Sequence, residues 1–577
     1  MIPAASPESP LFPAIPDTAL FWARWVPRLI LFSASLVILA RLAAPFEVGK
    51  DQTYQLEGAL RMSAGQGIVS TGNMRPSDPD ITPAPVPVPL TQWPPGFSIA
   101  IAALVGCGFS LTASLKLLFA LAAAAGWSGW AFVCGKLFAA IPATGSSRIL
   151  RSVPLIAAAL LPIFYTPLWS GTDILLWAGV PWIVPLTNRP AGSPGSYGAA
   201  VAAGILICVL FTFRYASAFL GIAAGGIIFC AVQPRWMELL KRYLALGLSS
   251  LLLTVPVVLF MRTGTVPLAD MYDNRTKTSE IISAAKGAHH AGKLIFAGPF
   301  LETMLSRVNW PPLVYAASIL AVAVILIAPV LRWRAGGRGK DDITLALLLL
   351  PAALIVFLLV VSRGFYLGVP RYYDPVLLCW VLACVSLSSS RRTAVAWGAR
   401  AVLAVFLTNL CGVTPLMAAM ESHRPRIIRT VLGYTPSKAA NLNATSAPVV
   451  FPDFGRLYSN KEDTKTRMAA LFQQYPEALF LVESYTLYIF DGFPGGPQPG
   501  SQIRPFPPER YLASAFSSID RKVFMVLDFN EKEPKPREWI GKVVYRNQWE
   551  NTVISEIQIR AGQRVLDAAR AMPRSEN

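Results

Sequence analysis

Long uncharged apolar stretches alternate along the chain with short polar or basic segments. Many of these stretches approach the roughly 20 apolar residues that a helix needs to cross a bilayer. Only helices satisfy their own backbone hydrogen bonds there. The pattern predicts an all-α polytopic membrane domain of about 11 transmembrane helices. The clearest stretches are 26–40, 94–115, 152–172, 197–213, 215–233, 243–261, 312–330, 343–361, 375–389 and 401–418.

The pattern changes at both ends of this apolar region. Residues 1–20 are rich in Pro, Ala and Ser and are predicted to form a disordered tail. The membrane domain then spans 21–418, with a long first external loop at 45–93. Residues 421–577 carry charges of both signs and turn residues, which predicts a small α/β extracytoplasmic C-terminal domain. Its expected helix is 463–475, and its expected strands lie in 447–454, 477–490, 521–529 and 542–549.

Basic turns set the predicted orientation in the membrane. The turns at 233–242, 332–340 and 388–392 should be cytoplasmic, as should the amino end with Arg24 and Arg28. The C-terminal domain is then external. Successive spans place all these basic segments on the cytoplasmic side only if 94–110 does not cross the membrane. That segment opens with two prolines and a glycine, which are poor helix-interior residues, and is predicted to be a short, partly inserted helix.

Composition supports a membrane protein and excludes one class of partner. The 577-residue chain is 54% hydrophobic and 15% charged, against about a quarter charged in soluble domains. The formal net charge of +18 reflects Lys and Arg residues in the short loops between apolar segments, as the positive-inside bias requires. There is no basic stripe with interleaved aromatic residues, so we expect no nucleic-acid partner. The 7 cysteines all lie in apolar segments without metal-ligand spacing, so disulfides and zinc sites are not expected.

Several ionisable and aromatic residues fall on the predicted external side. Ionisable groups at membrane depth are costly and are functional candidates by default. Each also has a structural interpretation: an Asp can cap a helix, an Arg can snorkel to the interface, and a Tyr can be an interfacial aromatic. Two carboxylates and several arginines beside a proline-broken helix favour a shared external site. The candidates are Asp51, Trp93, Asp173, Arg214, Tyr366, Arg371 and Tyr372.

The order and spacing of the surrounding motifs carry a resemblance. GKDQTYQLEGALRMSAGQG is followed by WPPGFSIAIAAL, WSGTDILLW, FRYASAFL and VPRYYDPVLL, within residues 1–390. This series resembles the GT-C superfamily of integral-membrane glycosyltransferases. It is most similar to the bacterial branch that includes protein O-mannosyltransferase-like and aminoarabinose-transferase-like proteins. The resemblance implies a bacterial inner-membrane protein with a cytoplasmic N-terminus and a periplasmic C-terminal domain.

The resemblance also implies a reaction. The donor would be a sugar on a polyprenyl phosphate, and a hexosyl- or pentosyltransferase would move it to a cell-envelope glycan, lipid or protein at the periplasmic face. By position, Asp51 resembles the carboxylate that activates the acceptor. Arg371 with Tyr372 resembles the site that holds the lipid phosphate, with Arg214 assisting. Asp173, Tyr366 and Trp93 complete the expected substrate site.

The sequence departs from the family at two of these positions. Asp173 stands where relatives frequently have Glu, and Asp51 is followed by Gln52 where many relatives have a second acidic residue. These departures leave the involvement of a divalent cation open.

Two other classes of function use similar cavities. A transporter or flippase of lipid-linked sugars should show repeated halves with interrupted helices in matching places. The long first loop has no counterpart in the second half of this chain. A polysaccharide polymerase or ligase usually carries its main functional loops later in the chain. A single external pocket open sideways to lipid would favour the transferase, and a water-filled route across the bilayer would favour transport.

Overall fold

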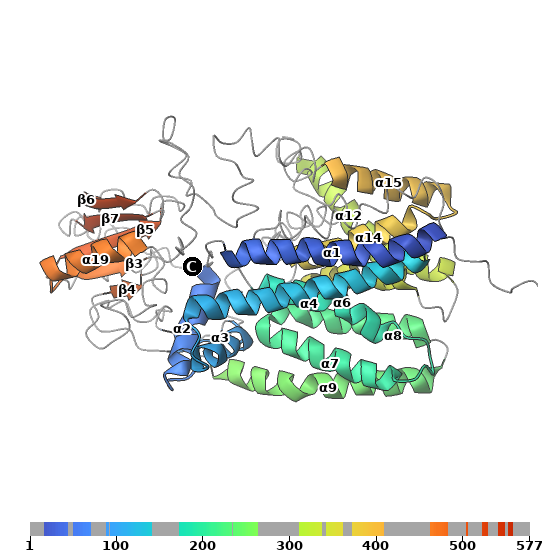
Figure 1. The fold of residues 1–577 in the computed structure, drawn as a ribbon, viewed down its shortest axis with the longest axis horizontal. Coiled ribbons are helices and arrows are strands. Elements are labelled where there is room, and N and C mark those ends of the chain that lie inside the picture. The colour runs from blue at the N-terminus through green and yellow to red at the C-terminus, as the bar shows by residue number, and fades with distance from the viewer. Residues whose placement is uncertain are drawn as a thin grey trace, which may run out of the picture.

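The computed structural model shows a helical bundle followed by a small β-sheet domain (Figure 1). It describes residues 17–43, 50–70, 88–91, 93–140, 172–232, 235–263, 311–336, 342–361, 372–408, 462–482, 503–505, 522–528, 540–547 and 552–557. The helical part contains α1 (Asp17–Ala43), α2 (Lys50–Ser63), α3 (Gly96–Gly106), α4 (Leu111–Ala140), α6 (Asp173–Thr187), α7 (Ser196–Phe213), the 3-10 helix η2 (Tyr215–Ala218), α8 (Phe219–Val232), α9 (Trp236–Arg262), α12 (Pro311–Gly336), α13 (Ile343–Val361), α14 (Asp374–Leu387) and α15 (Thr393–Thr408).

Within the described residues, six helical segments are long and apolar enough to cross a membrane: α4, α7, η2 with α8, α9, α12 and α13. The protein is therefore a polytopic membrane protein, while the predicted count of about 11 helices is not confirmed. Helix α1 begins at Asp17, so residues 17–20, predicted to be disordered, are helical. An acidic residue at a helix start is favoured by the helix dipole.

The apolar stretch predicted at 94–115 is divided into two helices. Helix α3 ends at Gly106, and Gly108 adopts a left-handed conformation with φ of 92°, which is the usual way to end a helix. Its 11 residues give α3 a length of about 16 Å. That is about half the thickness of the hydrocarbon core, so α3 is too short to cross it. The predicted short helix is confirmed.

The first loop begins and ends at the same end of the bundle. Near the start of α4, the Lys116 ammonium donates a hydrogen bond to the Leu42 carbonyl oxygen near the end of α1, at 2.6 Å. Helices α1 and α4 are therefore antiparallel, and α2 and α3 lie between them in sequence at what we call the loop end (Figure 1). Short strands β1 (Val69–Ser70) and β2 (Val88–Pro89) pair there in antiparallel fashion.

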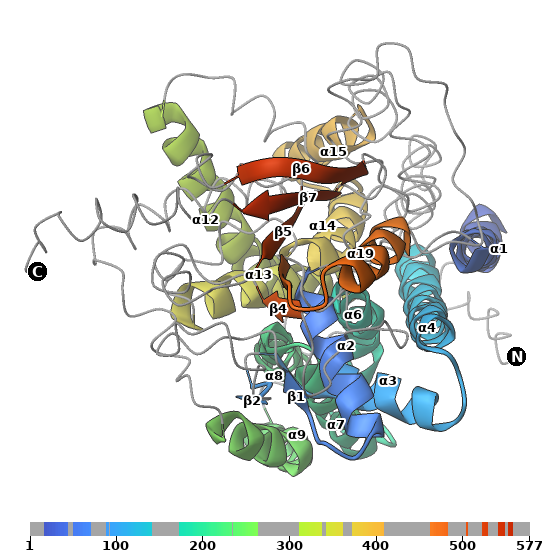
Figure 2. The ribbon, with the colours of Figure 1, turned by 90° about the vertical axis from the view of Figure 1, so that its left-hand side faces the viewer.

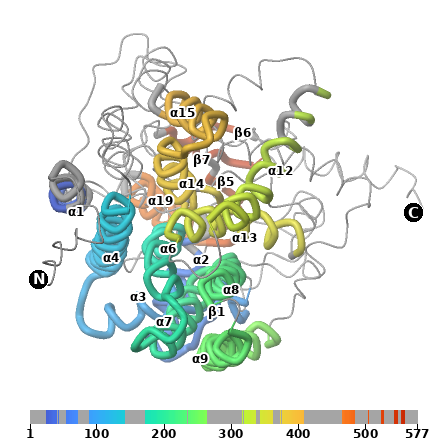
Figure 3. The backbone as a smooth tube through the Cα atoms, turned by 90° about the vertical axis from the view of Figure 1, so that its right-hand side faces the viewer, coloured from blue at the N-terminus to red at the C-terminus, as the bar shows by residue number. Residues whose placement is uncertain are grey.

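The predicted cytoplasmic turns meet at the opposite end, which we call the basic end. The buried Arg242 guanidinium donates to the carbonyl oxygens of Thr187 and Arg189, each at 3.0 Å, and so completes the end of α6. The hydroxyl of Tyr197 in α7 donates to the Glu238 carboxylate in α9. Figure 3 views the bundle from this end and shows α6 surrounded by other helices, in contact with α4, α7, α8 and α14. The side of the membrane that each end faces stays a prediction.

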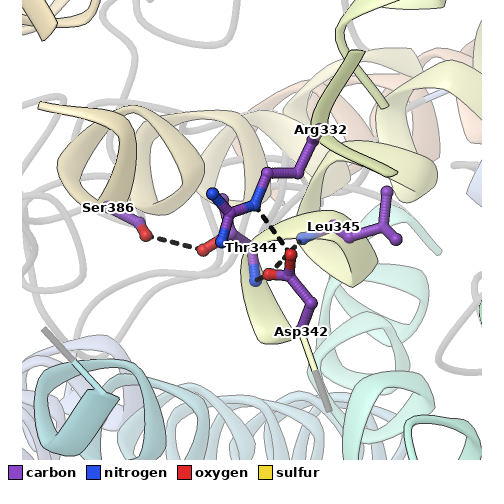
Figure 4. Close-up of polar contacts among 5 residues, drawn as sticks. All are labelled: Arg332, Asp342, Thr344, Leu345 and Ser386. Atoms are coloured by element: carbon purple, nitrogen blue, oxygen red, sulfur yellow. Dashed lines mark hydrogen bonds and ion pairs between the residues drawn. The ribbon is translucent and has the colours of Figure 1, made fainter. Parts of the chain in front are cut away.

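At the basic end Asp342 joins α12 to α13, and Thr344 links α13 to α14 (Figure 4). Its Oδ1 accepts hydrogen bonds from the backbone N–H groups of Thr344 and Leu345, which caps the start of α13. Its Oδ2 accepts from Arg332 Nε of α12 at 2.7 Å. The Thr344 hydroxyl lies 2.6 Å from that of Ser386 in α14. One carboxylate therefore satisfies a helix terminus and a neighbouring guanidinium together.

Helices α7 and α9 pack closely at Gly204. A Cβ atom at Gly204 would lie 2.5 Å from the Leu246 carbonyl oxygen, so we expect Gly204→Ala to force the helices apart. The expected loss is about 1–3 kcal/mol, the usual cost of overpacking. Gly198→Ala is the matched control, because a Cβ at that position of α7 meets open space. Thermal unfolding in detergent should show a lower midpoint for Gly204→Ala alone. Equal midpoints would contradict the close packing.

The C-terminal domain has a five-stranded mixed sheet beside one helix. Helix α19 (Glu462–Gln474) precedes strands β3 (Leu479–Val482), β4 (Ile503–Pro505), β5 (Val523–Asp528), β6 (Ile540–Asn547) and β7 (Thr552–Ile557). The sheet order is β4-β3-β5-β7-β6, with β3 parallel to β4 and β5, and β7 antiparallel to β5 and β6. Phe472, Phe480 and Phe524 form the aromatic core. Figures 1 and 2 place this domain beyond α2, at the loop end.

The predicted elements of this domain are largely found. The helix expected at 463–475 is α19, the strand regions expected at 477–490 and 521–529 contain β3 and β5, and the region expected at 542–549 overlaps β6. Strands β4 and β7 were not predicted. The buried residues of β7 are Thr552, Ile554, Ser555 and Ile557, so burial along this strand does not follow an alternation of apolar and polar residues. The strand expected at 447–454 lies outside the described residues.

Candidate active site

An ion pair between α6 and the α7–η2 junction is the centre of the candidate site. Arg214 Nη1 lies 2.5 Å from Asp173 Oδ1 and donates to the Thr172 hydroxyl at 3.4 Å. The Asp173 and Arg214 side chains are 4% and 12% exposed. Such burial shows that Arg214 does not snorkel to the interface, as one interpretation of the sequence allowed. A desolvated cation is held in place here by a desolvated carboxylate.

The backbone break at Arg214 turns its side chain towards α6. Helix α7 ends at Phe213, Arg214 is extended with φ −156° and ψ 118°, and η2 begins at Tyr215. The Ser217 backbone N–H and hydroxyl both donate to the Arg214 carbonyl oxygen, at 3.0 and 2.8 Å. The break therefore leaves that carbonyl satisfied. Asp173 faces this junction because it is the first residue of α6.

A third segment covers the guanidinium. The ring of Tyr372 lies over Arg214, with 4.7 Å from Cζ to the ring centroid, which is a cation–π contact. Tyr372 comes two residues before α14, which begins at Asp374. The ends of α6, α7 and α14 therefore meet around one buried arginine, and three residues predicted to share a site are brought together.

The first loop contacts this cluster through the WPPG segment. The rings of Trp93 and Tyr54 stack, with centroids 5.0 Å apart and planes 14° from parallel. The Tyr215 hydroxyl, one residue beyond Arg214, donates to the Thr91 carbonyl oxygen at 3.2 Å. Asp51 lies in the first turn of α2, three residues before Tyr54, and its side chain lies outside the described residues. Arg371 and Tyr366 also lie outside them, so their placement stays a prediction.

A buried polar cluster in α2 was not predicted. The Glu57 carboxylate accepts from Arg61 Nε at 2.9 Å and from the Ser70 hydroxyl at 2.5 Å. Arg61 also donates to the Gln66 side chain at 2.9 Å. The i,i+4 spacing of Glu57 and Arg61 is the sequence signal for this pair. The cluster ties strand β1 to α2 and gives the loop a rigid base.

The described residues do not define a site for a divalent cation. Among them, no three His, Cys, Asp or Glu side chains come together as a donor set. The six cysteines within the same ranges are free thiols, four of them buried.

Comparison with solved structures gives two matches of low similarity. The chain is similar to ArnT from Cupriavidus metallidurans. That structure is of ArnT bound to undecaprenyl phosphate, and its sequence is 14% identical to this chain. The superposition has a TM-score of 0.41 and covers 92% of this chain and 98% of ArnT. The arabinofuranosyltransferase AftD from Mycobacteria is 15% identical with a TM-score of 0.36, covering 87% of this chain and 36% of AftD. No family model and no curated protein matches the sequence. Neither match supports a comparison of individual residues.

Proposed function

We propose that this protein is a membrane glycosyltransferase. It moves a sugar from a polyprenyl-phosphate-linked donor to a cell-envelope glycan, lipid or protein at the periplasmic face. The observation that carries the proposal is the buried Asp173–Arg214 pair beneath Tyr372, at the same end of the bundle as the loop helix that bears Asp51. A desolvated guanidinium beside an external loop carboxylate suits displacement of a phosphate leaving group.

Arg214 retains a hydrogen-bond donor for this role. Its Nη1 pairs with Asp173, while its buried Nε has no hydrogen-bond partner among the described residues. A guanidinium N–H without a protein partner can donate a charge-assisted bond to a phosphate oxygen that reaches it. The Asp173–Arg214 pair is neutral overall. In our proposal the additional positive charge comes from Arg371, which directly precedes Tyr372 in the sequence.

The reaction we propose is a single displacement that inverts the anomeric centre. An acceptor hydroxyl attacks the anomeric carbon and transfers its proton to the Asp51 carboxylate. The bond between that carbon and the phosphate oxygen breaks, and polyprenyl phosphate leaves with the electron pair. Arg214 and Arg371 stabilise the negative charge on the leaving phosphate. Asp173 orients Arg214, and Trp93 and Tyr366 contribute contacts with the substrates.

Mass spectrometry of lipid-linked sugars and envelope glycans tests this function. Cells without the protein should lose one envelope sugar and accumulate the matching sugar on polyprenyl phosphate. Periodate added to intact spheroplasts should oxidise the accumulated sugar, because the lipid-linked sugar is exposed on the outer leaflet. Accumulation protected from periodate would instead indicate a flippase. Unchanged glycans and unchanged lipid-linked sugars would overturn the proposal.

A further inference from the structure

The WPPG segment, Trp93–Gly96 with its flanking residues Thr91 and Ser98, contacts α2 on one side. Trp93 stacks on Tyr54. The buried Ser98 hydroxyl donates to the Gln55 carbonyl oxygen at 2.7 Å. Tyr54 and Gln55 lie three and four residues after Asp51, about one turn further along the same helix. The position of this turn of α2 is thus set by the WPPG segment.

On its other side the segment contacts the residues around Arg214. Gly96 packs directly on the backbone of Thr212: a Cβ at Gly96 would lie 2.6 Å from the Thr212 carbonyl oxygen and 2.8 Å from its carbon. The Thr91 carbonyl oxygen accepts from Tyr215. Thr212 and Tyr215 lie on either side of Arg214 in the sequence. Glycine is required at position 96 because no side chain fits between the two backbones.

We propose that the WPPG segment positions Asp51 relative to Arg214, and so sets the distance between the proposed base and the proposed phosphate-binding group. This inference rests on the proposed function. Pro94 and Pro95 each fix a backbone φ angle, which makes the segment a stiff spacer. Gly96 and Tyr215 are then positioning residues, which touch neither substrate. Displacement reactions are sensitive to such spacing, because a shift of about 1 Å can lower turnover about 100-fold.

Gly96→Ala tests the inference, with Gly106→Ala as its matched control. Both glycines lie in α3, and a Cβ at Gly106 meets nothing within 4 Å. Gly96→Ala should lower envelope-sugar transfer per folded protein at least 10-fold. Its dissociation constant for undecaprenyl phosphate, measured by native mass spectrometry, should stay within about 3-fold, because Arg214 keeps Asp173 and Tyr372. Lower transfer with an unchanged dissociation constant would indicate a misplaced base, whereas a loss of affinity would indicate a damaged phosphate site. Gly106→Ala should leave both quantities unchanged.

A distance measurement gives a readout independent of activity. Nitroxides are attached through Met62→Cys on α2 and Thr263→Cys beyond α9, and both positions are exposed. The exposed Cys107 is replaced by Ser so that it is not labelled. The electron–electron distance should shift or broaden in Gly96→Ala and not in Gly106→Ala. If Gly96→Ala does not fold, Tyr215→Phe replaces it, since it removes only the hydroxyl that reaches Thr91. It should broaden the distance distribution and lower transfer about 3-fold or more.

The outcomes separate this inference from the function on which it rests. Unchanged distances in Gly96→Ala and Tyr215→Phe would overturn the positioning role. A shifted distance with normal transfer would also overturn it, provided that Asp51→Asn abolishes transfer in the same assay. Normal transfer by Asp51→Asn would instead show that the proposed function is wrong in its choice of base.

Discussion

Asp51→Asn is expected to lower sugar transfer in membranes at least about 100-fold, the smallest usual contribution of a general base. The amide has nearly the same shape as the carboxylate but cannot accept the proton of the acceptor hydroxyl. Asp51→Glu retains a carboxylate and should keep measurable activity. The measurement is the envelope sugar formed per folded protein, compared with the matching polyprenyl-phosphate sugar that remains.

Lys50→Gln is the control for the Asp51 experiment. It changes the charge of the neighbouring residue in the same first turn of α2 and should leave transfer within about 3-fold, because the proposed reaction gives Lys50 no role. The Asp51 variants should bind undecaprenyl phosphate normally, because the proposed phosphate groups are untouched. Near-normal turnover by Asp51→Asn would remove Asp51 from the chemistry.

The second large effect is expected at the Asp173–Arg214 pair. Each of the single variants Asp173→Leu and Arg214→Met leaves one buried charge without its partner, at a cost of about 3–5 kcal/mol of stability. The double variant removes both charges and should recover most of that loss. A double-mutant cycle of thermal unfolding in detergent measures the coupling. Full additivity of the two losses would show that the pair is not coupled in the folded protein.

The same variants separate stability from ligand binding. Arg214→Met and the double variant should both bind undecaprenyl phosphate at least about 10-fold more weakly. This change in affinity corresponds to the loss of one hydrogen bond to a charged group. Arg332→Met is the control, because it breaks an ion pair with Asp342 at the basic end and should leave this affinity unchanged. If the refolded double variant keeps full affinity, Arg214 does not contact the phosphate.

Much of the helical framework could be predicted from the sequence. The apolar stretches correspond to α7, α8, α9, α12 and α13, because hydropathy along one segment decides whether that segment can leave water. Charge parity predicts that 94–110 does not cross, and α3 ends after 11 residues. In the C-terminal domain, the apolar pattern locates α19 and three strands. The apolar stretches and the elements of the C-terminal domain each depend on residues that are close together in the chain.

The candidate site could be predicted only as a set of residues at one end of the bundle. Asp173, Arg214 and Tyr372 are singled out because each places a costly or amphipathic side chain at a membrane edge. That Arg214 pairs with Asp173 and lies beneath Tyr372 is a tertiary fact. The role of Gly96 is also hidden in the sequence, since its neighbour Thr212 comes more than 100 residues later.

The sequence by itself located five of the six described helical segments that are long and apolar enough to cross a membrane, and it singled out Asp173, Arg214 and Tyr372 as candidates for one site. The tertiary structure decided which of those residues touch. The physical reason is that membrane insertion depends on the summed transfer free energy of one local segment. A contact between helices depends on the rotation and depth of two segments that pack through distant small residues, such as Gly96 on Thr212 and Gly204 on Leu246.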